Sequence, residues 1–232
     1  MIKITPSELA KKLEQSKLNE DATEGEMIEF FQEAKRYNFY GVAVLPSYVP
    51  LASRILKGSG IKVVAGIAFP LGSSAPELKR LETEYAVNAG ADEVDVVINH
   101  SALFSGHYDV VERELKDVVK SAMGKPVKAI VELGYLDEKS LEKVCKIIID
   151  ARADFIKTST GFKRFTRWRP TFVEDIIRIK QIVGDQIKIK ASGGIKTTEQ
   201  ALAMLVAGAD RIGTSSGKDI IEGLKRLNKN LK

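Results

Sequence analysis

Lys157 is the residue of this sequence that is best placed to do chemistry. It follows the apolar run Ala153-Asp154-Phe155-Ile156 and precedes the polar stretch Thr158-Ser159-Thr160-Gly161-Phe162. The run is typical of the end of a buried strand, and the hydroxyl residues are typical of a loop. A charged lysine at the mouth of a core is costly, so the position favours a lysine that loses its proton easily. The alternative is a lysine whose ammonium group extends to the surface at a strand end.

A second lysine, Lys190, ends the next apolar run, Ile187-Lys188-Ile189-Lys190-Ala191. Neighbouring strands lie about 4.8 Å apart, so two inward-pointing ammonium groups would share a small cavity. Like charge and desolvation both disfavour protonation, and we expect the pKa of at least one of the two lysines to fall. A neutral lysine is an amine nucleophile toward a carbonyl group. We expect Lys188 to lie deeper in the core and to be structural.

An acid within a third apolar run completes the candidate catalytic set. Asp95 lies inside Val94-Asp95-Val96-Val97-Ile98. A carboxylate in a buried strand needs a partner, because an unpaired buried charge is expensive. An ion pair with one of the two lysines would supply that partner, and a role as proton acceptor is the functional interpretation.

Two glycine-rich turns are candidate phosphate ligands. They are Ser192-Gly193-Gly194-Ile195-Lys196-Thr197 and Gly213-Thr214-Ser215-Ser216-Gly217. Backbone N–H groups in such turns, together with a helix N-terminus, bind phosphate well. Ordinary tight turns are the alternative. The binding residues that we predict are Ser16, Thr158, Gly161, Gly193, Gly194, Gly213, Ser215 and Ser216.

Length and composition limit the function classes. The chain has 232 residues, a net charge of +5 and one cysteine, Cys145, which excludes an internal disulfide and fits a reducing, cytoplasmic location. No long apolar run predicts a membrane span. His100 and His107 lie outside any metal-ligand spacing, so we expect no metal. The basic loop Lys163–Pro170 is too short to predict nucleic-acid binding, and we interpret it as a lid or a subunit contact.

The elements that carry these residues alternate along the chain. Short β-branched runs alternate with amphipathic helices, which predicts parallel strands with helical crossovers. When Glu14–Leu18 is included as a weak first strand, there are eight such units. We therefore expect one α/β domain over residues 1–232, a closed (β/α)₈ TIM barrel, with an open doubly wound sheet as the alternative. In the helix after Ala75 we expect Leu78, Leu81, Tyr85 and Ala86 to face inward.

The motifs that carry these residues resemble those of the class I deoxyribose-phosphate aldolase family. The matching phrases are Glu93–Asn99, Phe155–Phe162, Lys188–Gly194, Arg211–Ser216, Phe69–Gly72 and Pro46–Val49. The resemblance implies a TIM barrel that cleaves 2-deoxy-D-ribose 5-phosphate to D-glyceraldehyde 3-phosphate and acetaldehyde, without a metal or an organic cofactor. It implies that Lys157 forms the Schiff base, that Lys190 perturbs Lys157, and that Asp95 is the acid–base residue.

The chain departs from the family pattern in three places. Glu14-Gln15-Ser16 stands where many members have Asp-His-Thr, so a longer carboxylate faces the second lysine. The loop after Phe162 is longer and more basic than usual, and the tail Lys229–Lys232 has no tyrosine. An aldolase for another phosphorylated sugar and a non-catalytic phosphate-binding barrel are the alternatives. A homodimer or homotetramer is the expected assembly.

Overall fold

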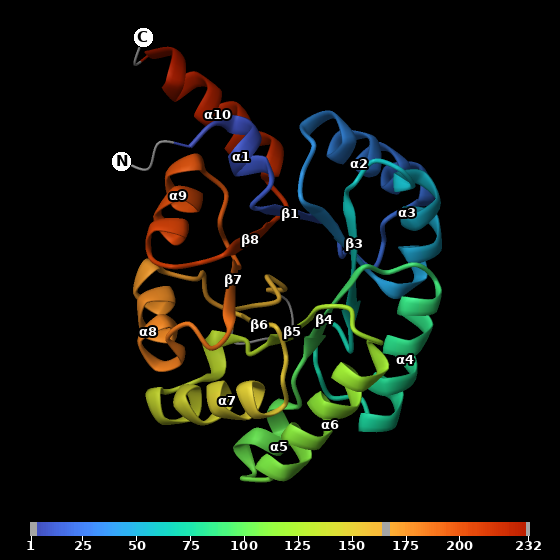
Figure 1. Ribbon diagram of the computed structural model, residues 1–232, viewed down its shortest axis with the longest axis vertical. Helices are drawn as coiled ribbons and strands as arrows, with labels where there is room; N and C mark the ends of the chain where they lie inside the picture. The colour runs from blue at the N-terminus through green and yellow to red at the C-terminus, as the bar shows by residue number, and fades with distance from the viewer. Residues whose placement is uncertain (1–3, 164–167, 231–232) are drawn as a thin grey trace.

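Eight parallel strands form a closed barrel in the computed structural model, which describes residues 4–163 and 168–230. The strand order follows the chain order, and the last strand pairs with the first (Figure 1). The strands are β1 (Leu13–Ser16), β2 (Gly41–Val44), β3 (Lys62–Ile67), β4 (Glu93–Val97), β5 (Val127–Ile130), β6 (Phe155–Lys157), β7 (Lys188–Ser192) and β8 (Arg211–Thr214).

Helices surround this ring of strands on the outside (Figure 1). They are α1 (Pro6–Ala10), α2 (Glu24–Tyr37), α3 (Val49–Leu56), α4 (Pro76–Asn88), α5 (His100–Phe104), α6 (Tyr108–Ser121), α7 (Glu138–Asp150), α8 (Val173–Val183), α9 (Thr198–Val206) and α10 (Gly217–Asn230). Two short 3₁₀ turns, Pro46–Tyr48 and Leu133–Tyr135, follow β2 and β5. The helix α10 lies beside α1, so both ends of the described chain lie on one side of the barrel (Figure 1).

The predicted (β/α)₈ barrel is confirmed, and the open-sheet alternative is wrong. The decisive element is the weak first strand, which spans Leu13–Ser16 rather than Glu14–Leu18. Its Glu14 pairs in register with Gly41 of β2 on one side and with Gly213 of β8 on the other. A strand with hydrogen-bonded neighbours on both sides leaves the sheet no edge at this position.

Local signals begin several helices. Thr23 accepts a hydrogen bond from the Glu26 backbone N–H, and the Glu26 carboxylate accepts one from the Thr23 N–H, which forms a capping box at the start of α2. Thr197 and Gln200 form the same arrangement at α9. This cap fixes the direction in which the chain leaves the glycine-rich turn after β7.

The predicted inward face of α4 is wrong at three of its four residues, whereas Ala86 is buried as predicted. Leu78, Leu81 and Tyr85 are 57%, 48% and 52% exposed, whereas Lys79 and Thr83 are fully buried. The inward stripe is thus shifted by one position, which is about 100° of helix rotation. The cause is an ion pair, because Lys79 Nζ lies 2.9 Å from the carboxylate oxygens of buried Glu114 on α6.

Candidate active site

Lys157 lies at the carboxyl end of β6, where its side chain enters the barrel. The side chain is buried, with 4% of its surface exposed, and Nζ donates a hydrogen bond to Asp95 Oδ2 at 2.8 Å. The strand holds Lys157 between Ile130 of β5 and Lys190 of β7 as its register partners. The carboxyl ends of barrel strands are where active sites of this architecture form.

Lys190 is therefore the direct neighbour of Lys157, as predicted. Its Nζ donates to the same oxygen, Asp95 Oδ2, at 2.6 Å, and to Glu14 Oε2. One carboxylate oxygen consequently lies between two ammonium groups. The longer carboxylate at position 14 reaches the second lysine from β1, so the departure from the family phrase retains the ion pair.

The pKa of Lys157 is lowered to about 8. Burial is the largest cause, because it disfavours the charged form; Asp95 acts in the opposite direction, and the like charge of Lys190 lowers the pKa further. The expected fall is thus present, although Lys190 contributes less to it than desolvation does. Burial alone would raise the pKa of Asp95, but Lys128, Lys157 and Lys190 outweigh that effect and hold it well below its usual value.

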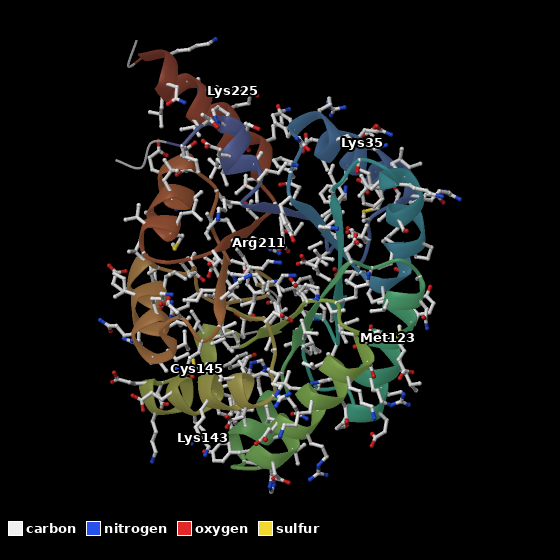
Figure 2. The ribbon with its side chains drawn as sticks, viewed as in Figure 1. Lys35, Met123, Lys143, Cys145, Arg211 and Lys225 are labelled. Carbon is white, nitrogen blue, oxygen red and sulfur yellow. The ribbon has the colours of Figure 1, made fainter. Side chains whose placement is uncertain are left out.

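Lys128 and Arg211 lie deeper in the barrel than Lys157 and Lys190, and the sequence interpretation did not include them. Lys128 on β5 is fully buried, and its Nζ lies 3.0 Å from Asp95 Oδ1 and 2.5 Å from Glu93 Oε2. Arg211 begins β8 in the barrel interior, near the middle of the strand ring (Figure 2). The signal was available, because Lys128 lies inside Val127-Lys128-Ala129-Ile130 just as Asp95 lies inside its own apolar run. Lys188, expected in the interior, is instead exposed, with Nζ 5.6 Å from the centre of the Phe155 ring.

A cavity of about 460 Å³ opens above the two lysines. It joins the loops after β1, β6, β7 and β8, and a small phosphorylated sugar fits a volume of this size. The predicted site residues that line it are Lys157, Lys190, Ser16, Gly161, Gly193, Gly194, Gly213 and Ser215.

Three predicted residues do not line this cavity. Asp95 lies beneath the lysines. Thr158 is buried, and its hydroxyl accepts from the Ser192 N–H and donates to the Ser192 carbonyl at 2.8 Å each, so it joins β6 to β7. The Ser216 N–H donates to Thr214 Oγ1 at 2.9 Å. Thr158 thus makes a structural contact between two strands, and the Ser216 N–H is bonded within its own loop.

The turn after β7 brings backbone to the cavity wall. Gly193 and Gly194 have φ of +100° and +81°, a left-handed conformation that glycine adopts without strain. A Cβ on Gly193 would lie 3.0 Å from Ser159 Cβ, and one on Gly194 would lie 3.0 Å from Pro170 Cβ. Side chains larger than hydrogen would therefore crowd the loop that follows Lys157.

The loop after β8 and the start of α10 contain the second glycine-rich turn that was predicted to bind phosphate. Gln15 accepts from the Gly217 N–H at 2.7 Å through Oε1, and its amide donates to the Ser215 carbonyl at 3.2 Å. The first strand thus orients this loop. The N-terminus of α10 begins at Gly217, where a helix dipole favours an anion.

Glu132 is a further site residue that the sequence interpretation missed. It follows β5 in a left-handed conformation with φ of +47° and is buried. Its Oε2 accepts from the Thr160 N–H at 2.9 Å and from the Thr160 hydroxyl at 2.5 Å. Glu132 thereby fixes the loop after Lys157, and its unusual backbone conformation is not visible in sequence periodicity.

The basic loop is described only at its two ends. Lys163 and Trp168 line the cavity, with Lys163 Nζ 4.4 Å from the Trp168 ring centre. The predicted lid or subunit contact falls largely on residues 164–167, which lie outside the described residues.

Neither a metal site nor a membrane span occurs in the described part of the chain. Within residues 4–163 and 168–230, no group of three His, Cys, Asp or Glu side chains could hold a metal ion. Over the same ranges, no helix is long and apolar enough to cross a membrane.

Comparisons with known proteins agree with the motifs. Residues 11–223 match the model of the DeoC/LacD family aldolases. The chain is 44% identical over 221 residues to a deoxyribose-phosphate aldolase of Caldicellulosiruptor saccharolyticus, which covers 94% of this chain and 99% of that protein. The corresponding enzyme of Thermococcus gammatolerans is 45% identical over 222 residues, with 94% and 97% covered.

Solved structures show the same relationship. An aldolase named QR15 superposes with a TM-score of 0.91 at 41% identity over the full length of both chains. A tetrameric deoxyribose phosphate aldolase from Aeropyrum pernix superposes with a TM-score of 0.87 at 34% identity, covering 96% of this chain and 93% of that one. With a family match over most of its length and relatives well above 30% identity, this chain belongs to the deoxyribose-phosphate aldolase family of lyases.

Proposed function

We propose that the chain reversibly cleaves 2-deoxy-D-ribose 5-phosphate to D-glyceraldehyde 3-phosphate and acetaldehyde through a Schiff base on Lys157. The observation that carries the proposal is the buried Lys157 amine, with a pKa of about 8, at the floor of a cavity whose upper wall is made of phosphate-type turns. Near neutral pH an appreciable fraction of such an amine is neutral and nucleophilic. The activity of the relatives supports the same substrate.

The proposed reaction proceeds through an imine and an enamine on Lys157. The Lys157 amine adds to the C1 aldehyde of the open-chain sugar, and loss of water gives a protonated imine. Withdrawal of electrons into this imine breaks the C2–C3 bond as the C3 hydroxyl loses its proton, which releases glyceraldehyde 3-phosphate. The enamine left on Lys157 takes a proton at C2, and water then hydrolyses the imine to free acetaldehyde.

Protons reach these steps through Lys190. Asp95 lies beneath the cavity, and Lys190 both lines the cavity and donates to Asp95 at 2.6 Å. Lys190 is therefore the group that can exchange a proton with the substrate, with Asp95 and Glu14 holding its ammonium in place. The family resemblance implies that Asp95, which Lys190 contacts, is the acid–base residue.

Phosphate binding is assigned to the two glycine-rich turns. Gly193, Gly194 and Ser215 line the cavity, and α10 begins at Gly217, two residues after Ser215, so that its N-terminus can contribute a favourable dipole. This arrangement orients the sugar so that C1 lies over Lys157. In the cell, the reaction would serve breakdown of deoxyribose phosphate from deoxyribonucleosides.

Reductive trapping tests the proposal. Acetaldehyde and borohydride should leave a stable ethyl adduct on Lys157, located by peptide mass spectrometry. Lys157→Leu should abolish both the adduct and cleavage of deoxyribose 5-phosphate. Lys188→Leu removes an exposed lysine of the neighbouring strand and is the matched control, which should keep both. Cleavage that persists in Lys157→Leu would refute the proposal.

A substrate panel separates the remaining alternatives. Another phosphorylated sugar that is cleaved faster than deoxyribose 5-phosphate would change the substrate and leave the imine chemistry in place. Thermal stabilisation by the sugar phosphate without turnover would indicate a binding barrel. We also propose a homodimer or homotetramer, since the Aeropyrum pernix structure is described as tetrameric; light scattering on the purified chain measures the mass directly.

A further inference from the structure

The barrel interior holds a continuous charge network below the cavity. Arg211 Nη1 lies 2.9 Å from Glu14 Oε1 and 2.7 Å from Glu93 Oε2. Lys128 Nζ lies 2.5 Å from Glu93 and 3.0 Å from Asp95. Glu14 continues to Lys190, and Asp95 to Lys157. The network therefore runs without a break from the amino end of β8 to the amine at the cavity floor.

The charges in this network do not balance. Among the described residues it contains the three carboxylates Glu14, Glu93 and Asp95 and the four bases Lys128, Lys157, Lys190 and Arg211, so the fully ionised set carries one excess positive charge. Excess charge in a buried site is removed by loss of a proton from the base that is least compensated.

The number of carboxylate partners identifies that base. Lys128 lies within 4 Å of all three carboxylates, and its pKa is raised although burial acts against it. Lys190 and Arg211 each pair with two carboxylates. Within residues 4–163 and 168–230, Lys157 has an ion pair with Asp95 alone, and it shares that oxygen with Lys190. Lys157 is thus the member with no carboxylate of its own.

Arg211 carries a permanent positive charge in this network and is held in place by its neighbours. It does not line the cavity, so it does not touch a substrate bound there. Its guanidinium carbon lies 3.7 Å from the Tyr40 ring centre and 4.7 Å from the Phe155 ring centre, which holds the group between two aromatic faces. The Tyr40 hydroxyl, from the residue before β2, donates to Glu93. A guanidinium stays protonated in proteins, so Arg211 cannot be the group that loses the proton.

We propose that Arg211 is a positioning residue that keeps Lys157 neutral from the start of β8, because its permanent charge pairs with Glu14 and Glu93 and leaves Lys157, which has the fewest carboxylate partners, as the base that releases the excess proton. The chemical purpose of this device rests on the proposed function, since a Schiff base requires the neutral amine. The charge arrangement itself can be measured without any aldolase reaction.

Charge-altering variants of the network test the proposal. The readout is the pH midpoint of Lys157 acetylation by acetic anhydride, followed by peptide mass spectrometry, with exposed Lys188 as the internal reference. Arg211→Met removes the fixed charge and should raise the midpoint by about one pH unit, a tenfold loss of neutral Lys157 at fixed pH. Arg211→Lys keeps the charge and should return the midpoint toward that of the wild type.

A second pair of variants changes the charge in the opposite direction. Glu14→Gln removes one carboxylate and should lower the midpoint, and Glu14→Gln combined with Arg211→Met restores the count and should bring it back. If Arg211→Met does not fold, the comparison of Glu14→Gln with the double variant, which differ only at position 211, decides. A midpoint that stays unchanged in the folded variants, with only activity or stability lost, would show that Arg211 is merely structural and would overturn the proposal.

The same experiments separate this inference from the proposed function. Shifted midpoints in a chain that does not cleave deoxyribose 5-phosphate would retain the inference and refute the proposed substrate. If the enzyme cleaves that sugar but the pH midpoint of Lys157 acetylation does not change with substitution at position 211, the proposed function would be retained and the inference about Arg211 would be refuted.

Discussion

Lys157 and Lys190 are register partners on adjacent strands, and their amines share a single oxygen, Asp95 Oδ2, at 2.8 and 2.6 Å. Two ammonium groups this close to one carboxylate oxygen cannot both be well compensated. The geometry therefore couples the protonation of one lysine to that of the other.

The formation of the reductive adduct should depend on pH through Lys157. Its pKa of about 8 means that the neutral fraction grows about tenfold per pH unit below 8 and levels off above it. Lys190→Met removes a like charge that lowers this pKa, so the midpoint should move to higher pH. Initial trapping rates with acetaldehyde and borohydride, measured from pH 6 to 10 in both proteins, check this; a midpoint that moves downward in Lys190→Met would contradict it.

Loss of the shared carboxylate should cost stability as well as activity. Asp95→Asn leaves three buried lysines short of a partner, and removing one member of a buried ion pair costs about 3–5 kcal/mol. The free energy of unfolding in guanidinium chloride measures the effect. Asp185→Asn is the matched control, because Asp185 pairs with Lys180 on an exposed surface and should unfold like the wild type.

The buried ion pair between Lys79 of α4 and Glu114 of α6 should contribute to the free energy of unfolding. Lys79→Met leaves Glu114 buried without its cation and should lower the unfolding free energy by about 3–5 kcal/mol. Because Glu114 also accepts from the Asn99 N–H at 2.8 Å, the end of β4 should loosen too. Lys116→Met removes an exposed pair with Glu112 on the neighbouring helix face and provides the comparison. Equal stability of the two variants would refute this interpretation.

A single methyl group should disturb Lys190 without touching any charge. A Cβ on Gly213 would lie 3.0 Å from Lys190 Cε and 3.1 Å from Ser192 Cβ, so Gly213→Ala must displace the lysine or the strand. We expect kcat for cleavage to fall more than tenfold, a shift of about 1.4 kcal/mol in the barrier. Gly25→Ala, which meets nothing within 4 Å in α2, should keep full activity. Retained kcat in Gly213→Ala would show that Lys190 has room to move.

The sequence predicted the barrel and the upper half of its charged interior. Lys157, Lys190 and Asp95 were located because each interrupts an apolar run, and such residues in a barrel must meet inside it. The same argument applies to Lys128, which was overlooked. The burial of Arg211 was not predicted, because this residue begins a strand and charged residues are common at strand ends.

Other features depend on partners that are far apart in the chain. Lys79 was not predicted to be buried, because Leu78 and Leu81 form an equally good apolar stripe one residue away, and its partner Glu114 lies 35 residues further on. The contact of Lys190 with Glu14 spans 176 residues. Local periodicity carries no information about which distant charges will meet, so the interior network was only partly predictable.

Gln15 joins the first strand of the barrel to the loop that follows the last strand. Through one amide group, a residue of the first strand holds the Ser215 carbonyl and the Gly217 N–H, which follow the last strand. The loop assigned to the substrate phosphate is therefore shaped only when the chain's beginning has met its end. A nascent chain in which β8 has not yet left the ribosome lacks these contacts of Gln15. Aldolase activity during synthesis would therefore appear only after the whole barrel has formed.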